Sequence, residues 1–206
     1  MAHNVITISR EFGTGARTIG QKLASELGYA YYDRAIIQMA ADKSGLSPDF
    51  IEKNEEKSTN SFLFNIATSA YISSGMNLQY TVPVNDKAFL AQSEVIRELA
   101  EKGNCVIVGR CANYILAEHP NLIRVFVRAD KPDRIKRIVE EYGYSGKSAE
   151  SELNKIDKGR ANYYKYYTGS TWKSMDNYDL CINTSRMDVA HAVELLKDVA
   201  RLTFGE

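Results

Sequence analysis

The sequence lacks an excess of charge of either sign and has only three cysteines in 206 residues. Lysine and arginine total 26, as do aspartate and glutamate, so no overall basic field is available to bind a nucleic-acid polymer. Cys105, Cys111 and Cys181 are odd in number and lack metal-ligand spacing, which predicts free thiols in a reducing compartment. The first residues lead directly into a strand-like run without a signal peptide, so we expect a cytoplasmic protein.

Long uninterrupted hydrophobic runs are absent as well. Residues 58–85 contain no charged side chain, but asparagine, serine and glutamine interrupt them throughout, so we expect neither a transmembrane helix nor a membrane partner. This segment fits a half-buried helix and loop, or an insert that serves as a lid, an acceptor site or a subunit contact; we favour an insert. Together with the tyrosine-rich residues 162–172, it presents apolar and aromatic surface that predicts a homodimer.

Short apolar segments alternate with longer amphipathic segments along the chain. Strands are predicted at residues 5–9, 29–32, 105–108, 124–127 and 180–182, and helices at residues 18–27, 34–43, 86–102, 132–141, 149–167 and 187–202. This order predicts one α/β domain over residues 1–206, with a mainly parallel five-stranded sheet flanked by helices. Residues 141–151 combine glycines, serines and mixed charge, which indicates a mobile loop between two helices.

The first predicted strand leads into a glycine-bearing turn and then a helix. Gly13 and Gly15 allow successive backbone N–H groups to point inward, and the helix N-terminus adds partial positive charge, so this segment favours a phosphate. The usual lysine is missing. If Gly15 is the last glycine of G-x-x-x-x-G-K-[ST], Ala16 takes the lysine position, Arg17 takes the hydroxyl position, and a hydroxyl returns at Thr18.

Two other interpretations fit the same turn. Gly13-x-Gly15-x-x-Thr18 nearly matches a dinucleotide fingerprint, and Asp33 follows about 20 residues on, where a ribose-binding acid would lie. That fingerprint places its first glycine directly at the strand end, whereas residues 10–12 intervene here, which favours the larger phosphate loop. A tight strand-to-helix turn also uses glycine for purely structural reasons.

An ordered series of motifs resembles the cytidylate-kinase-like family, a branch of the nucleoside monophosphate kinases. In chain order the motifs are ITISREFGTGARTIGQKLASELGYAYYD, VIVGRCANYIL, ADKPDRIKRI, DKGRANYYKYYTGSTW and YDLCINTS. The resemblance implies a P-loop NTPase fold with an acceptor-binding insert at residues 46–85 and a lid at residues 141–160. It also implies transfer of the ATP γ-phosphoryl group, with Mg²⁺, to a nucleoside monophosphate or a related small acceptor.

The resemblance assigns ATP binding to the loop residues Gly13, Thr14, Gly15, Ala16, Arg17 and Thr18, and we add Arg10, at the other end of the loop, as a candidate cation. It makes Thr18 the candidate magnesium ligand. A phosphoryl-transfer site must neutralise charge on the β- and γ-phosphates, and Arg17 or Arg10 could supply the cation that Ala16 lacks. An arginine near a helix N-terminus is unfavourable unless an anion lies there, which favours a functional role for Arg17 over a surface one.

For the acceptor, the resemblance implies Asp33, Arg110 and Asp157. Arg110 follows a buried strand and suits an acceptor phosphate or base carbonyl by bidentate donation. Asp33 could align the acceptor or hold water on magnesium, and it fits a helix N-cap equally well. Cys111 stands where the family usually has aspartate, and the acceptor-phosphate arginine expected near Met39 is missing. Both departures argue against a simple assignment of cytidylate as the acceptor.

Four charged residues flank the loop predicted at residues 141–151 within the lid. Arg134 and Arg137 precede this loop, and Asp157 and Arg160 follow it; the i, i+3 spacing puts each pair on one helix face. Closure could bring these arginines over the phosphates, so we expect catalytic roles for Arg134, Arg137 and Arg160 together with Arg17; solvated helix charges are the alternative.

A second class of function fits the same sequence, namely a non-catalytic nucleotide-binding module with a degenerate P-loop. The missing loop lysine favours that module, whereas the arginines on both sides of the lid favour the enzyme.

Overall fold

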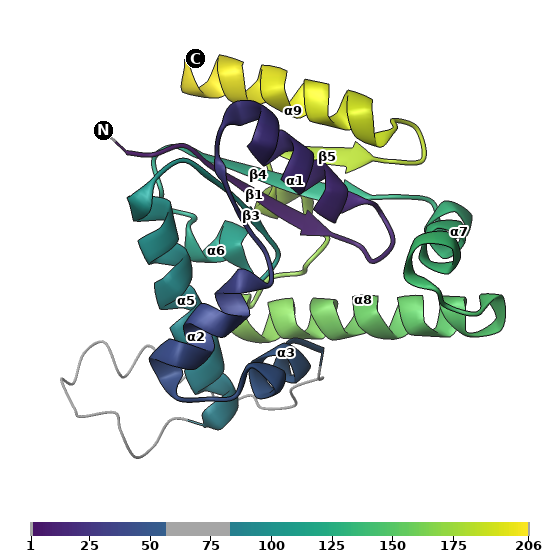
Figure 1. Ribbon diagram of the computed structural model, residues 1–206, viewed down its shortest axis with the longest axis horizontal. Coiled ribbons are helices and arrows are strands. Elements are labelled where there is room, and N and C mark those ends of the chain that lie inside the picture. Colours follow the sequence, from purple (N-terminus) through teal and green to yellow (C-terminus); the bar gives the residue numbers. More distant parts are fainter. Residues whose placement is uncertain (1, 57–82, 206) are drawn as a thin grey trace.

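The computed structural model describes residues 2–56 and 83–205 (Figure 1). It contains a five-stranded sheet of order β2-β3-β1-β4-β5, in which every neighbouring pair of strands is parallel. Because all the strands run in one direction, their carboxyl ends share one edge, where α/β sheets bind ligands. The strands are β1 Val5–Arg10, β2 Ala30–Tyr32, β3 Cys105–Val108, β4 Leu122–Arg128 and β5 Leu180–Asn183.

Helices cover both faces of this sheet. In Figure 1, α1 and α9 lie on one face, α2 and α5 on the other, and α7 beyond the carboxyl ends of the strands. None of the helices in the two described ranges is long and apolar enough to cross a membrane. The helices are α1 Ala16–Leu27, α2 Ala35–Ser44, α3 Pro48–Glu56, α5 Val84–Lys102, α6 Ala112–Ile115, α7 Lys131–Tyr142, α8 Gly146–Thr168 and α9 Val189–Phe204, with a short 3-10 helix η2 at Met175–Asn177.

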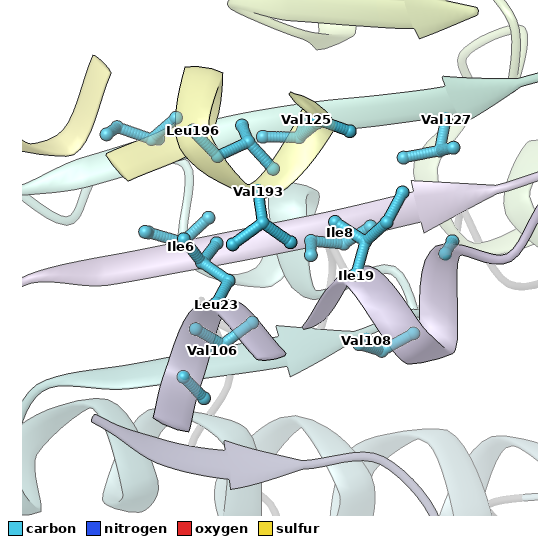
Figure 2. Close-up of a cluster of buried hydrophobic side chains, with 14 of the residues drawn as sticks. Ile6, Ile8, Ile19, Leu23, Val106, Val108, Val125, Val127, Val193 and Leu196 are labelled. Carbon is cyan, nitrogen blue, oxygen red and sulfur yellow. The ribbon is translucent and has the colours of Figure 1, made fainter. Parts of the chain in front are cut away.

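The central strand β1 is buried on both faces. Ile6 and Ile8 belong to the core formed with α1 and α9, whereas Val5 belongs to the core formed with α2 and α5. Successive side chains of a strand point to opposite faces, so a strand covered on both sides has buried side chains at successive positions rather than at alternate ones. Figure 2 shows Ile6 and Ile8 beside Ile19 and Leu23 of α1 and Val193 and Leu196 of α9.

The predicted α/β architecture is confirmed, and each predicted element begins and ends within three residues of the observed one. Two helices, α3 and α6, were not predicted. The predicted loop at residues 141–151 is wrong in length, because α7 continues to Tyr142 and α8 begins at Gly146. Gly143 ends α7 in the left-handed conformation, with φ of 72°, so three residues suffice to reverse the chain.

The tyrosine-rich segment packs inside the protein rather than forming an exposed surface. Tyr163, Tyr164 and Tyr167 of α8 are each at most 4% exposed. Tyr167 stacks on Phe89 of α5 with ring centroids 4.0 Å apart, and Trp172 meets Phe126 of β4 edge to face. Internal packing therefore accounts for residues 162–172, one of the two segments that led us to expect a homodimer. The other segment, residues 58–85, falls mainly on residues 57–82, outside the described residues.

Two leucines of α9 provide a test of this packing. Leu196 is 1% exposed in the core of Figure 2, whereas Leu202 is 79% exposed on the same helix. We expect Leu196→Ala to lower the free energy of unfolding by about 2–5 kcal/mol, because it removes buried methyl groups and leaves a cavity. Leu202→Ala should change it by less than about 0.5 kcal/mol in the same urea titration. Equal losses in the two variants would contradict the packing of α9 on the sheet.

Candidate active site

A turn of five residues joins β1 to α1 and encloses a cavity of about 310 Å³, here called the turn cavity, lined by residues 10–17 among others. Gly13 and Gly15 have φ of 79° and 77°, in the left-handed region that favours glycine. Thr14 is buried, and its hydroxyl donates to the Glu11 carbonyl oxygen at 3.0 Å. The Thr184 hydroxyl donates to the Thr14 carbonyl oxygen at 2.9 Å, which ties the turn to the end of β5.

The N-terminus of α1 opens toward this turn. Its N-cap is Gly15, no side chain caps it, and its first turn contains no acidic residue. The first backbone N–H groups of a helix have no partner within the helix, and they carry partial positive charge. Such an end favours an anion, as the glycine pattern predicted. Ala16, at the position of the usual lysine, is only 2% exposed and supplies no charge.

Behind the turn, Arg134 of α7 joins two carboxylates in a buried group. Its guanidinium lies 3.3 Å from Glu11 Oε2 and 2.6 Å from Asp157 Oδ2. Asp157 also accepts a hydrogen bond from the Phe12 backbone N–H at 2.8 Å, while Glu11 pairs with Lys173. Burial raises the pKa of Asp157 above its ordinary value, although the Phe12 N–H and Arg134 oppose this shift. This arrangement, called the Glu11 brace below, fixes the turn to α7 and α8.

The structure separates the arginines that we grouped around the lid. Arg137 donates to the Gly13 carbonyl oxygen at 3.0 Å, and Arg160 donates to the Arg10 carbonyl oxygen at 3.2 Å. Arg160 also lies over the Phe12 ring, 5.7 Å from its centroid, and lines the turn cavity. Arg134 and Arg137 hold the outside of the turn and line neither this cavity nor its neighbour.

The neighbouring cavity, of about 120 Å³, surrounds Asp33 and is called the Asp33 cavity. Asp33 is 6% exposed; its carboxylate accepts from Arg17 Nε at 2.8 Å and from Arg110 Nη1 at 3.3 Å. Burial alone would raise the pKa of Asp33, but Arg10, Arg110 and Arg17 outweigh burial and hold it below its ordinary value. Asp33 is therefore an ionised carboxylate that positions two arginines, and it is not the N-cap of α2, which is Arg34.

The backbone beside this cavity is strained. Gly109, Arg110 and Cys111 follow β3 with φ of 83°, 56° and 54°, and left-handed conformations in succession are unfavourable for residues with a side chain. A β-carbon at Gly109 would lie 1.9 Å from Arg10 Nη1, so the glycine leaves room for that guanidinium. The strain directs Arg110 into the cavity, where it is buried against Asp33.

The two cavities share four arginines. Arg10, Arg17, Arg34 and Arg160 line both, so a group that passes from one cavity to the other would move among these cations. Arg34 was not among the predicted site residues, although its place directly after Asp33 at the end of a predicted strand could have revealed it. Met39 lines neither cavity.

Of three further residues discussed from the sequence, only Cys111 lines one of the two cavities. Cys111 is 6% exposed and packs with the aromatic cluster while lining the Asp33 cavity. Asp157 lies in the Glu11 brace rather than at this cavity. Thr18 is exposed on the first turn of α1 and lines neither cavity, so its role as a magnesium ligand stays a prediction. Within residues 2–56 and 83–205, no cluster of three or more His, Cys, Asp or Glu side chains could hold a metal ion.

Comparison with known proteins decides the family. A model of the cytidylate kinase-like family matches residues 5–186. The chain belongs to this family. A cytidylate kinase of Ignicoccus hospitalis is 25% identical over 194 residues, which cover 94% of this chain and 96% of the relative.

Solved structures share the fold. An uncharacterized protein from Eubacterium ventriosum is 30% identical, covers 96% of this chain and 98% of its own, and has a TM-score of 0.70. A gluconokinase from Sinorhizobium meliloti, at 15% identity, shares the fold with a TM-score of 0.55, covering 98% of this chain and 94% of its own. The fold is thus that of P-loop kinases, and the family relationship supports ATP-dependent phosphoryl transfer in general.

Gly13 offers a direct test of the turn. A β-carbon there would lie 2.8 Å from the Arg134 carbonyl oxygen and 2.8 Å from Ile138 Cγ2, whereas a β-carbon at Gly28 would meet nothing within 4 Å. Both glycines are left-handed, so alanine brings a similar strain of about 1–2 kcal/mol at each. We expect Gly13→Ala to lower the free energy of unfolding by about 1–3 kcal/mol more than Gly28→Ala does.

The two variants should also differ in ATP affinity, measured by calorimetry. Gly13→Ala should weaken ATP binding by at least about tenfold, because it moves the backbone that surrounds the turn cavity. Gly28→Ala, at the far end of α1, should bind ATP as the wild type does. If Gly13→Ala retains full ATP affinity, the turn does not bind the phosphates.

Proposed function

We propose that the protein transfers the γ-phosphoryl group of ATP to a nucleoside monophosphate or a related small acceptor. The observation that carries this proposal is the set of four arginines lining both the turn cavity and the Asp33 cavity. Phosphoryl transfer needs little covalent help from the protein and depends on positioning and on cations around the transferring group. A cation set between two adjoining cavities suits a reaction between a donor and an acceptor.

In this proposal the ATP phosphates bind at the turn of residues 10–17 and at the N-terminus of α1. The acceptor occupies the Asp33 cavity, where Arg110 is already oriented by Asp33. Arg17 is 43% exposed along its side chain and lines both cavities, so its guanidinium can contact the group in transfer. Mg²⁺ would enter with ATP and take most of its ligands from phosphates and water; it supplies charge neutralisation for the phosphates.

The alternative is a non-catalytic nucleotide-binding module, and the uncharged, buried Ala16 favours it. A screen with γ-labelled ATP and Mg²⁺ against CMP, UMP, AMP and GMP separates the two functions. The proposal expects label to appear in at least one nucleoside diphosphate. If the protein binds ATP but transfers label to none of these or other small acceptors, the binding module is the better description.

Arg17 is the residue that we expect to replace the missing lysine in the reaction. If its guanidinium contacts the phosphoryl group mainly in the transition state, Arg17→Ala should lower turnover about a hundredfold or more, corresponding to roughly 2–4 kcal/mol. The dissociation constant of ATP should change much less. Steady-state kinetics with the best acceptor and calorimetry with ATP give the two quantities.

Three further variants serve as comparisons for Arg17→Ala. Arg10→Ala removes the other loop arginine, and Arg97→Ala removes an exposed arginine of α5 that lines neither cavity. Ala16→Lys in the Arg17→Ala background should not restore turnover, because position 16 is buried and a buried lysine tends to lose its charge. Full activity in Arg17→Ala would rule out Arg17 as the catalytic cation, and rescue by Ala16→Lys would show that the conventional geometry fits.

A further inference from the structure

Arg34 differs from the other arginines of the site in how it is held. It follows Asp33 directly, is the N-cap residue of α2, and lines both cavities. Its side chain is 71% exposed, and within the described part of the chain its ion pair is with Glu52 of α3, at 2.7 Å. Glu52 is itself 43% exposed and lines the Asp33 cavity alone.

Three of the other arginines that line the Asp33 cavity have partners inside the protein. Arg110 is 3% exposed along its side chain and pairs with the buried Asp33, as does Arg17. Arg160 donates to the backbone of Arg10 and lies over an aromatic ring. An exposed ion pair such as Arg34–Glu52 is weak, because water screens the charges and two long side chains must be ordered. Arg34 can therefore exchange its partner at little energetic cost.

The charge around the Asp33 cavity shows what the new partner would be. The lining of this cavity includes two carboxylates, Asp33 and Glu52, and five arginines, namely Arg10, Arg17, Arg34, Arg110 and Arg160. Five positive and two negative charges give the lining a net formal charge of +3. Asp33 is shared between Arg17 and Arg110, so its charge does not compensate Arg34. This positive charge favours binding of an anion. A guanidinium suits a phosphate because its N–H groups can donate to two phosphate oxygens at once.

We propose that Arg34 binds the phosphate group of the acceptor, leaving Glu52 when the acceptor enters. This inference rests on the proposed function and adds to it the residue that recognises the acceptor's anionic group. The acceptor is favoured over ATP because Glu52, the present partner of Arg34, lines the Asp33 cavity and not the turn cavity. Glu52 then competes with the acceptor for Arg34 in the free protein.

The test is calorimetric binding of CMP, UMP, AMP and GMP, together with the parent nucleosides, to wild type and to Arg34→Met. We expect Arg34→Met to weaken binding of the best monophosphate by about ten- to a hundredfold, the effect of losing one charge-assisted contact. Affinity for its parent nucleoside and for ATP should stay within about twofold. Arg97→Met is the matched control, an exposed arginine that lines neither cavity. Glu52→Gln should tighten monophosphate binding, and Arg34→Lys should retain part of it.

The outcomes distinguish this inference from the proposed function. Unchanged monophosphate affinity in Arg34→Met, or an equal loss for the nucleoside, overturns the role of Arg34 even when the wild type is an active kinase. A loss confined to ATP would assign Arg34 to the donor and also overturns it. If the wild type binds monophosphates but transfers no phosphate, the kinase function fails while the binding result still decides the role of Arg34. Failure of the wild type to bind any monophosphate overturns both.

Discussion

Two carboxylates, Glu11 and Asp33, pair with three of the arginines that lie at the carboxyl edge of the sheet, and the geometry of the site depends on these pairs. Unit charges of like sign repel by roughly 1–4 kcal/mol at about 4 Å near a protein surface. Glu11 joins Arg134 on one side of the turn, and Asp33 joins Arg17 and Arg110 on the other. The turn between them can then present its backbone N–H groups without being displaced by side-chain repulsion.

The arginine paired with Glu11 and an arginine paired with Asp33 differ in their exposure to the cavities. Arg134 is 6% exposed and paired with Glu11 and Asp157, so it is part of the scaffold that sets the position of the turn. Arg17 has the same kind of ion pair, but 43% of its side chain is exposed and faces both cavities. Exposure to the cavities, rather than ion pairing as such, separates an arginine that can reach a ligand from one that holds the fold.

Much of the fold could be predicted from the sequence because buried strands and amphipathic helices have distinct apolar periods. The helix α3 was missed because PDFIEKNEE has few apolar residues, and α6 because it has only four residues. The i, i+3 spacing in α7 correctly predicted that Arg134 and Arg137 share a face, which meets the turn: Arg134 contacts Glu11 and Arg137 contacts the Gly13 carbonyl oxygen. Their catalytic roles stay a prediction.

The roles of these residues could not be read from spacing. The helix period predicts which residues share a face. Contacts between segments distant in the sequence determine whether that face lies against backbone, a counter-ion or a cavity. Asp157 illustrates this, since its partners Phe12 and Arg134 lie 145 and 23 residues away. The same limit applies to Arg34, whose partner Glu52 belongs to a helix that the periodicity did not predict.

The strained backbone at Arg110 belongs to the arrangement that gives the Asp33 cavity one fixed cation. Each left-handed residue costs of order 1–3 kcal/mol and persists only where its surroundings determine it. Here the buried pair with Asp33 and the room provided by Gly109 do so, and Arg110 is therefore oriented before any ligand arrives. A fixed cation lowers the entropy lost on binding. It cannot follow a ligand into the cavity, whereas an exposed arginine on the rim, such as Arg34, can.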